Sequence, residues 1–144
     1  MLTQIEADAL IQMPKRLAGK GPLELPNPGD SCHLDAESED GRESFIFDVA
    51  RGRIRLSKCT FQNRYRVVER LVRVDIDGPP HENPDGEVVP CPHIHVYREG
   101  YEDKWAKPLP ADRFIDSTDL VTVLRDFLLF CKVTAVPEIH RGLQ

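Results

Sequence analysis

SFIFDVARGRIRLS, residues 44–57, decides the fold class, because two strand-like segments stand on either side of a turn signal. Residues 44–50 are rich in strand-forming side chains, and residues 53–57 alternate polar and apolar at a period of two. We expect Gly52 to supply the positive φ that a tight turn between two antiparallel strands requires. The stretch therefore predicts an antiparallel hairpin.

Two further strands are predicted downstream, each with one polar face. In residues 67–77, Val72, Val74 and Ile76 share one face, and Arg73, Asp75 and Asp77 share the other. In residues 93–97, Ile94 and Val96 face the core, and His93, His95 and Tyr97 face away from it. Residues 78–90 form a proline-rich loop, with a turn at 83–86.

Helices are predicted at both ends of this strand region. Thr3 and Glu6 form a capping box, which satisfies the first free amides of a helix. Residues 116–133 form a second helix, capped by Asp116 or Ser117, whose apolar stripe is Leu120, Val121, Leu124, Phe127, Leu128 and Cys131. We therefore expect one α+β domain over residues 1–144, a central antiparallel β-sheet with an N-terminal and a C-terminal α-helix.

Composition excludes several classes of protein. No apolar run approaches the roughly 18 residues that span a bilayer, and the charges of the first 19 residues run opposite to those of a secretory signal. The four cysteines, Cys32, Cys59, Cys91 and Cys131, form no CxxC pair. We expect a cytoplasmic protein with free thiols.

Charge is distributed unevenly along the chain. The net charge of −5 by itself argues against a nucleic-acid-binding protein. However, residues 30–48 hold seven acidic residues with one base, and residues 51–73 hold eight bases with one acid. An acidic chain can therefore still present a basic face to RNA.

A dense block of unusual residues spans positions 71–109. It contains LVRVDIDGPPHENPDG (71–86) and PCPHIHVYREGYEDKWAKPLP (90–110). These segments resemble the signature of a family of uncharacterised small bacterial and phage proteins, R-x-D-x-x-G-P-P-H-x-N-P-D-G followed by C-P-H-I-H-x-Y-R-E-G-Y-x-D-K-W-A. The resemblance supplies no activity. It implies roles in phage–host conflict, such as toxin, antitoxin or inhibitor of host defence.

The leading functional hypothesis is a small RNase of toxin type that needs no metal. His93 and His95 would act as general base and acid, because imidazole titrates near neutral pH. Arg98 and Lys104 would stabilise the phosphorane charge. Substrate-binding side chains would stack on bases or contact phosphates, and we assign this role to Tyr97, Tyr101, Trp105, Arg53, Arg55 and Arg73.

Two alternatives, and a purely structural role, remain open. His81, His93 and His95 could hold a metal ion, zinc being the candidate, in a hydrolase, although their spacing matches no standard zinc module. The block could instead be a rigid surface that binds a host or partner protein without catalysis. Each residue could also be structural, but a plain turn has no need of three histidines.

Overall fold

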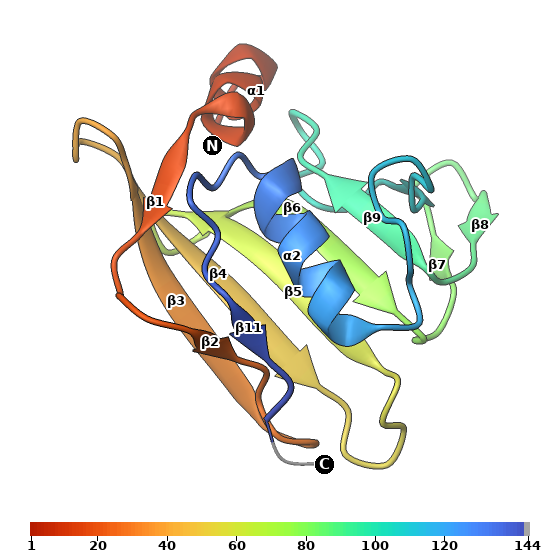
Figure 1. Cartoon of the computed structure of the whole chain (residues 1–144). Coiled ribbons are helices and arrows are strands. Elements are labelled where there is room, and N and C mark those ends of the chain that lie inside the picture. The colour runs from red at the N-terminus through yellow and green to blue at the C-terminus, as the bar shows by residue number, and fades with distance from the viewer. Residues whose placement is uncertain (143–144) are drawn as a thin grey trace.

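The computed structural model describes residues 1–142 and contains two helices and a large antiparallel sheet (Figure 1). The helices are α1 (Gln4–Gln12) and α2 (Leu120–Phe130). The strands are β1 (Lys15–Leu17), β2 (Leu23–Glu24), β3 (Ser31–Ser38), β4 (Ser44–Arg51), β5 (Cys59–Tyr65), β6 (Glu69–Ile76), β7 (His81–Glu82), β8 (Val88–Val89), β9 (His93–Val96), β10 (Ala106–Pro108) and β11 (Ile139–His140). The predicted α+β class is confirmed, with an N-terminal helix, a C-terminal helix and a large antiparallel sheet.

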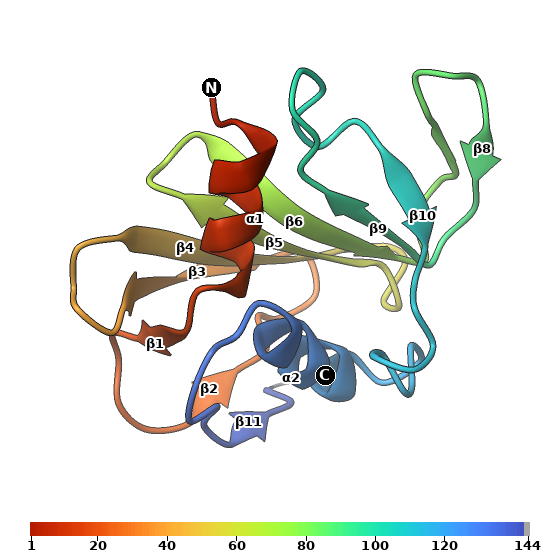
Figure 2. The same ribbon diagram turned by 90° about the horizontal axis from the view of Figure 1, so that it is seen from above.

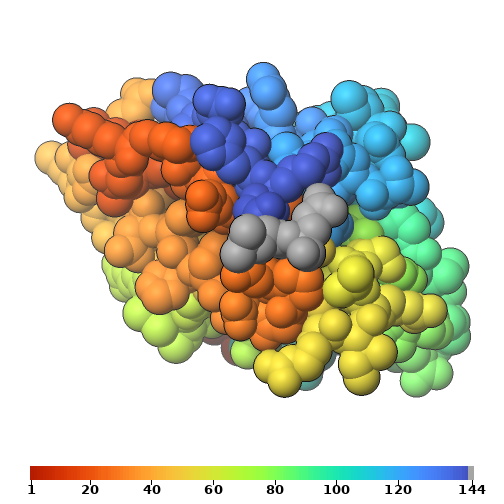
Figure 3. All heavy atoms as spheres, turned by 60° about the horizontal axis from the view of Figure 1, so that its bottom comes forward, coloured from red at the N-terminus to blue at the C-terminus, as the bar shows by residue number. Residues whose placement is uncertain are grey.

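The main sheet has seven strands in the order β1-β3-β4-β5-β6-β9-β10, and every pair in it is antiparallel. Two small sheets complete the fold: β7 pairs with β8, and β2 pairs in parallel with β11. The β2–β11 pairing brings the C-terminal segment, blue in Figure 3, against the orange N-terminal segment.

The hydrophobic core lies between one face of the sheet and α2. Phe127 of α2 packs against Phe47 of β4 and Phe61 of β5, with ring centroids 6.1 and 6.0 Å apart. The predicted apolar stripe of this helix is buried, apart from the half-buried Val121. Figure 2 shows α2 below the sheet, α1 in front of the strands, and β8 on the side away from α2.

Both helix starts can be compared with the predicted caps. The capping box of α1 is confirmed, because the Thr3 hydroxyl accepts from the amide of Glu6 and the Glu6 carboxylate accepts from the amide of Thr3. The cap predicted at Asp116 or Ser117 is wrong. α2 begins after Asp119, and the Asp116 carboxylate is instead used in a turn with Thr118.

The hairpin predicted within residues 44–57 is half right. Its first strand is β4, but residues 53–57 are a loop and the partner strand is β5. The loop closes on itself, because the Gly52 amide donates to the Lys58 carbonyl and the Lys58 amide to that of Arg55. Ile54 and Leu56 are exposed, whereas β5 buries alternate residues in the core. Five alternating residues do not make a strand when their apolar side chains have no surface to pack against.

Candidate functional site

Polar side chains line the face of the sheet away from α2. Pairing places Arg73 of β6 opposite His95 of β9, and Asp75 of β6 opposite His93. On the other side of β6, Asp75 lies opposite Thr60, whose hydroxyl donates to the Asp75 carboxylate at 3.0 Å. The alternation that buries Val72, Val74 and Ile94 in the core thus sends these polar residues to the opposite face.

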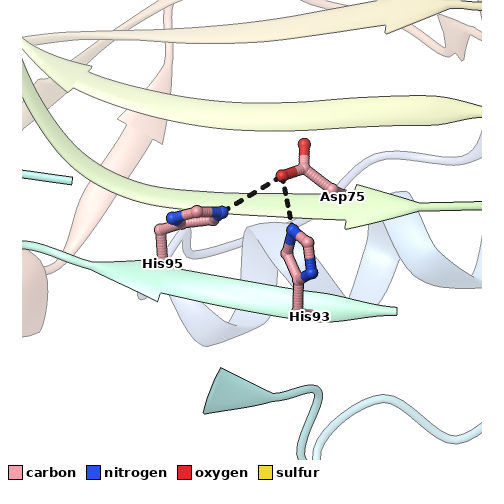
Figure 4. A group of neighbouring side chains, drawn as sticks. All are labelled: Asp75, His93 and His95. Atoms are coloured by element: carbon pink, nitrogen blue, oxygen red, sulfur yellow. Dashed lines mark hydrogen bonds and ion pairs between the residues drawn. The ribbon is translucent and has the colours of Figure 1, made fainter. Parts of the chain in front are cut away.

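Both histidines converge on one oxygen of Asp75 (Figure 4). His93 Nε2 lies 2.9 Å and His95 Nε2 lies 3.2 Å from Asp75 Oδ2. The two histidine side chains are 2% and 0% exposed, and that of Asp75 is 19% exposed. A half-buried carboxylate and two buried imidazoles therefore meet at one point.

The other ring nitrogen of each histidine is held by a backbone carbonyl. His93 Nδ1 lies 3.2 Å from the carbonyl oxygen of Val89, and His95 Nδ1 lies 2.8 Å from that of Asp103. A carbonyl oxygen only accepts, so each Nδ1 carries a hydrogen and donates it. If the rings are neutral, the lone pair of each Nε2 then points at the Asp75 oxygen, and these electron-rich atoms repel one another. A cation, or a proton on each Nε2, must therefore lie between the nitrogens and the oxygen.

Arg73 supplies one such cation. Its Nη2 lies 3.0 Å from His95 Nε2, and its Nε lies 3.3 Å from Asp75 Oδ2. Its Nη1 pairs with the buried carboxylate of Asp103 at 3.1 Å. The guanidinium thus lies beside the point where the two histidines and Asp75 meet.

Asp75 is ionised in this setting. Burial raises the pKa of its carboxyl, but the contact with His95, the charge of Arg73, the contact with His93 and the hydrogen bond from Thr60 outweigh it, and they hold the pKa well below its usual range. Burial raises the pKa of the nearby Cys91 thiol, and the carboxylates of Asp75 and Asp77 add to this effect. Although Cys91 Sγ lies 3.6 Å from His93 Nδ1, it therefore stays a thiol and is a poor nucleophile.

A pocket of about 240 Å³ opens onto the cluster. Asp75 and His93 form part of its wall, together with Thr60, Lys58, Arg73 and His81. His95 lies behind them and does not line it. A ligand in the pocket would meet two cationic side chains beside the carboxylate and the imidazoles of His81 and His93.

His81 comes from the β7–β8 hairpin and completes a group of three imidazole rings. Its ring centroid lies 4.6 Å from that of His95 and 6.1 Å from that of His93. His81 Nε2 donates to the carbonyl of Lys104 at 2.7 Å, and this bond holds the ring in place. The structure thus brings together the three histidines expected from the sequence.

The set of metal-ligand atoms differs from the expected one. Within residues 1–142, Asp75, His93 and His95 are the one group that offers three ligand atoms within 4.8 Å of one another. The sequence predicts that Asp75 lies on the polar face of its strand, but it does not predict a ligand there. The strand pairing that puts it opposite His93 was the missing information.

The remaining predicted site residues lie elsewhere. Tyr97 is buried and donates its hydroxyl hydrogen to the Leu2 carbonyl, which anchors the start of α1. Arg98 stacks on Trp105 at 4.3 Å, and Tyr101 meets the same ring edge-on. Arg98 and Trp105 line a second pocket together with Ile94 and Val96, which alternate along β9 with the two histidines. The Lys104 side chain is exposed, and Arg53 and Arg55 lie in the loop after β4.

Comparisons with known proteins agree with the resemblance noted in the sequence. A family model described as "Family of unknown function (DUF6978)" matches residues 2–133, which include the whole block 71–109. The chain belongs to this family. No curated protein and no solved structure shows significant similarity to it. Among residues 1–142, no helix is long and apolar enough to cross a membrane.

Proposed function

We propose that this member of a family of unknown function is a divalent-metal-dependent hydrolase of phosphate esters, with Asp75, His93 and His95 as its metal ligands. The observation that carries the proposal is the convergence of both Nε2 atoms on Asp75 Oδ2. Ligand atoms about 2.1 Å from one ion stand about 3.0–3.4 Å apart, close to the separations found here.

The hydrogen bonds behind the rings support the same conclusion. Histidines that bind metals usually donate their second ring hydrogen to a carbonyl or carboxylate, which fixes the tautomer. His93 and His95 both do so, to Val89 and Asp103. Two histidines and one carboxylate leave coordination positions open, as catalytic sites require.

The pocket favours an anionic substrate. A divalent ion at this site would lower the pKa of a bound water and polarise a phosphoryl oxygen. The oxygen of that water would attack phosphorus, the bond to the leaving alcohol would break, and a proton would pass to the leaving oxygen. Lys58 and Arg73 would neutralise the charge that develops on the phosphoryl group.

The metal-free RNase hypothesis remains a second candidate, because Arg73 already places a cation at the cluster. In that reaction Arg73 would stabilise the phosphorane, and His93 would act as general base. Against it, His95 is fully buried and does not line the pocket, so it has no direct path to a substrate proton. A role as a non-catalytic inhibitor would leave the convergence of ligand atoms without a purpose.

Calorimetric titration with Zn²⁺ and Mn²⁺ after removal of metals tests the proposal. We expect one ion per chain, with binding weakened at least about 100-fold in Asp75→Asn and His93→Gln. His33→Gln, an exposed histidine of β3, is the matched control and should bind as the wild type does. Equal binding by all four proteins, or none by any, would show that the cluster is not a metal site.

Hydrolysis of bis(p-nitrophenyl) phosphate and of total RNA, with and without EDTA, separates the two candidates. The metal hypothesis expects cleavage that EDTA abolishes. It also expects Arg73→Gln to bind the ion about tenfold more tightly, because a competing cation is removed. Cleavage that survives EDTA and is lost in Arg73→Gln supports the metal-free enzyme instead. Metal binding without hydrolysis of either substrate would refute the hydrolase.

A further inference from the structure

We infer that residues 51–58, the last residue of β4 and the loop between β4 and β5, bind a single strand of nucleic acid and direct one of its phosphates into the pocket. This inference rests on the proposed function and names its substrate class. The loop is the yellow segment that extends beyond the sheet between β4 and β5 in Figure 1. It contains Arg51, Arg53, Arg55 and Lys58, and no acidic residue.

The loop carries cationic charge that the fold leaves available. Arg55 pairs with Asp77 at 3.5 Å, but within residues 1–142 neither Arg53 nor Lys58 forms an ion pair. Both side chains are exposed. In a chain with a net charge of −5, this local excess of positive charge fits a polyanion rather than general solubility.

Two large apolar side chains stand between these bases. Ile54 is 97% exposed and Leu56 is 57% exposed. Leaving such side chains in water forgoes the free energy of burial, so a ligand that covers them gains it. The faces of unstacked bases are suitable apolar surfaces, and a single strand offers them while a duplex hides them.

The loop is held in shape although its side chains are exposed. The Arg51 guanidinium donates to the carbonyls of Pro26 and Leu56, and the Ser57 hydroxyl donates to Asp77. A side chain on Gly52 would come within 2.6 Å of the Arg55 carbonyl oxygen, so the turn needs glycine there. A loop of fixed shape loses little conformational entropy when it binds.

Lys58 joins the loop to the catalytic pocket. It lines the pocket together with Arg73 and Thr60, and its Cε lies 3.8 Å from where a Cβ on Gly78 would stand. Cationic side chains therefore extend from the exposed loop to the wall of the pocket that contains Asp75 and His93. A basic and apolar loop also suits an anionic membrane surface, but a flat membrane cannot follow the cations into a pocket.

Fluorescence anisotropy tests the inference. A labelled 12-nucleotide single strand, of RNA and separately of DNA, is titrated in EDTA, so binding is read without metal or cleavage. We expect Arg53→Gln with Lys58→Gln to bind at least about tenfold more weakly, with a salt slope smaller by about 1.4. Lys20→Gln with Arg42→Gln, two exposed bases outside the loop, is the charge-matched control and should bind as the wild type does.

Separate experiments measure what the apolar side chains contribute to strand binding and whether a duplex or a membrane surface binds instead. Ile54→Ser with Leu56→Ser should weaken binding about fivefold without changing the salt slope, and a duplex of the same sequence should bind less well. Equal binding by the loop and control variants would overturn the inference, as would tighter binding to phosphatidylserine vesicles than to the strand. Calorimetric titration of Arg53→Gln with Mn²⁺ should match that of the wild type, because Arg53 does not line the pocket, so failure of the metal site and failure of the loop are distinguished.

Discussion

At the scale of single residues, Lys15 shows how a charge can be buried to hold the two helices. Its side chain is fully buried, and its ammonium donates to the carbonyls of Ile11, Met13 and Cys131 at 3.1, 3.0 and 2.8 Å. These carbonyls lie at the C-terminal ends of α1 and α2, where a helix leaves acceptors without partners and where positive charge is favourable. One side chain thus satisfies acceptors of both helices.

The pH dependence of stability tests this role. Burial lowers the pKa of Lys15 to about 8, below the ordinary 10.5 that it regains on unfolding. Between these two values the unfolded chain binds more protons than the folded one, so stability rises with pH. From pH 7.5 to 10.5, the free energy of unfolding of the wild type should rise by about 3 kcal/mol relative to Lys15→Met.

Urea denaturation at the two pH values measures the difference. At pH 7.5 the variant should be less stable by about 2–4 kcal/mol, since three buried carbonyls lose their donor. Lys20→Met, at an exposed lysine, controls for general effects of charge and should follow the wild type at both pH values. A wild-type advantage that stays flat or shrinks as the pH rises would mean that Lys15 is not desolvated.

At the scale of elements, the β7–β8 hairpin forms the part of the site that stands above the sheet. Asn83, at the start of its turn, is buried, and its side chain accepts from the amide of Ala106 at 2.8 Å and donates to the carbonyl of Ala106 at 2.9 Å. This pair of bonds replaces a rung of strand pairing and ties the hairpin to β10. His81, two residues before Asn83, is held over the other histidines in the same way through the Lys104 carbonyl.

Asn83→Asp should loosen this hairpin. A carboxylate can still accept from the Ala106 amide, but its second oxygen would face the Ala106 carbonyl oxygen with no hydrogen between them. We expect a loss of about 2–3 kcal/mol in the free energy of unfolding and weaker Zn²⁺ binding, because the pocket wall moves. Urea denaturation and calorimetry measure both effects. Glu82→Gln, the exposed neighbour, is the control, and an equally small effect of both substitutions would contradict the role of Asn83.

The elements also show what the sequence could predict. Alternation correctly predicts that Arg73 and Asp75 lie on the face opposite Val72 and Val74, and that His93 and His95 share one face. Side chains alternate between the two faces along any strand, whichever strand it pairs with. Pairing was not predictable, since 16 residues of loop and hairpin separate β6 from β9. The convergence on Asp75 depends on that register. In the same way, Trp105 and Arg98 are close to His95 in sequence but line a different pocket from the one at the cluster.

At the scale of the whole molecule, the sheet separates the hydrophobic core from the candidate site. One face carries the core beneath α2, and the other carries the Asp75–His93–His95 cluster on two paired strands of a seven-stranded sheet. Because the same strands serve both faces, unfolding the sheet separates the ligand atoms. A metal that binds this cluster therefore binds the folded state alone, and its binding free energy adds to the stability of the whole chain.

Thermal unfolding tests this coupling. An ion present at 100 times its dissociation constant should add about 2.7 kcal/mol, which for a chain of this length raises the Tm by roughly 5–10 °C. The four free cysteines can hold Zn²⁺ in the unfolded chain and reduce the shift, so Mn²⁺, which thiolates bind weakly, is measured in parallel. The shift should vanish in Asp75→Asn and persist in His33→Gln. An equal rise in both variants would place the ion elsewhere, and no rise in the wild type would separate the cluster from metal binding.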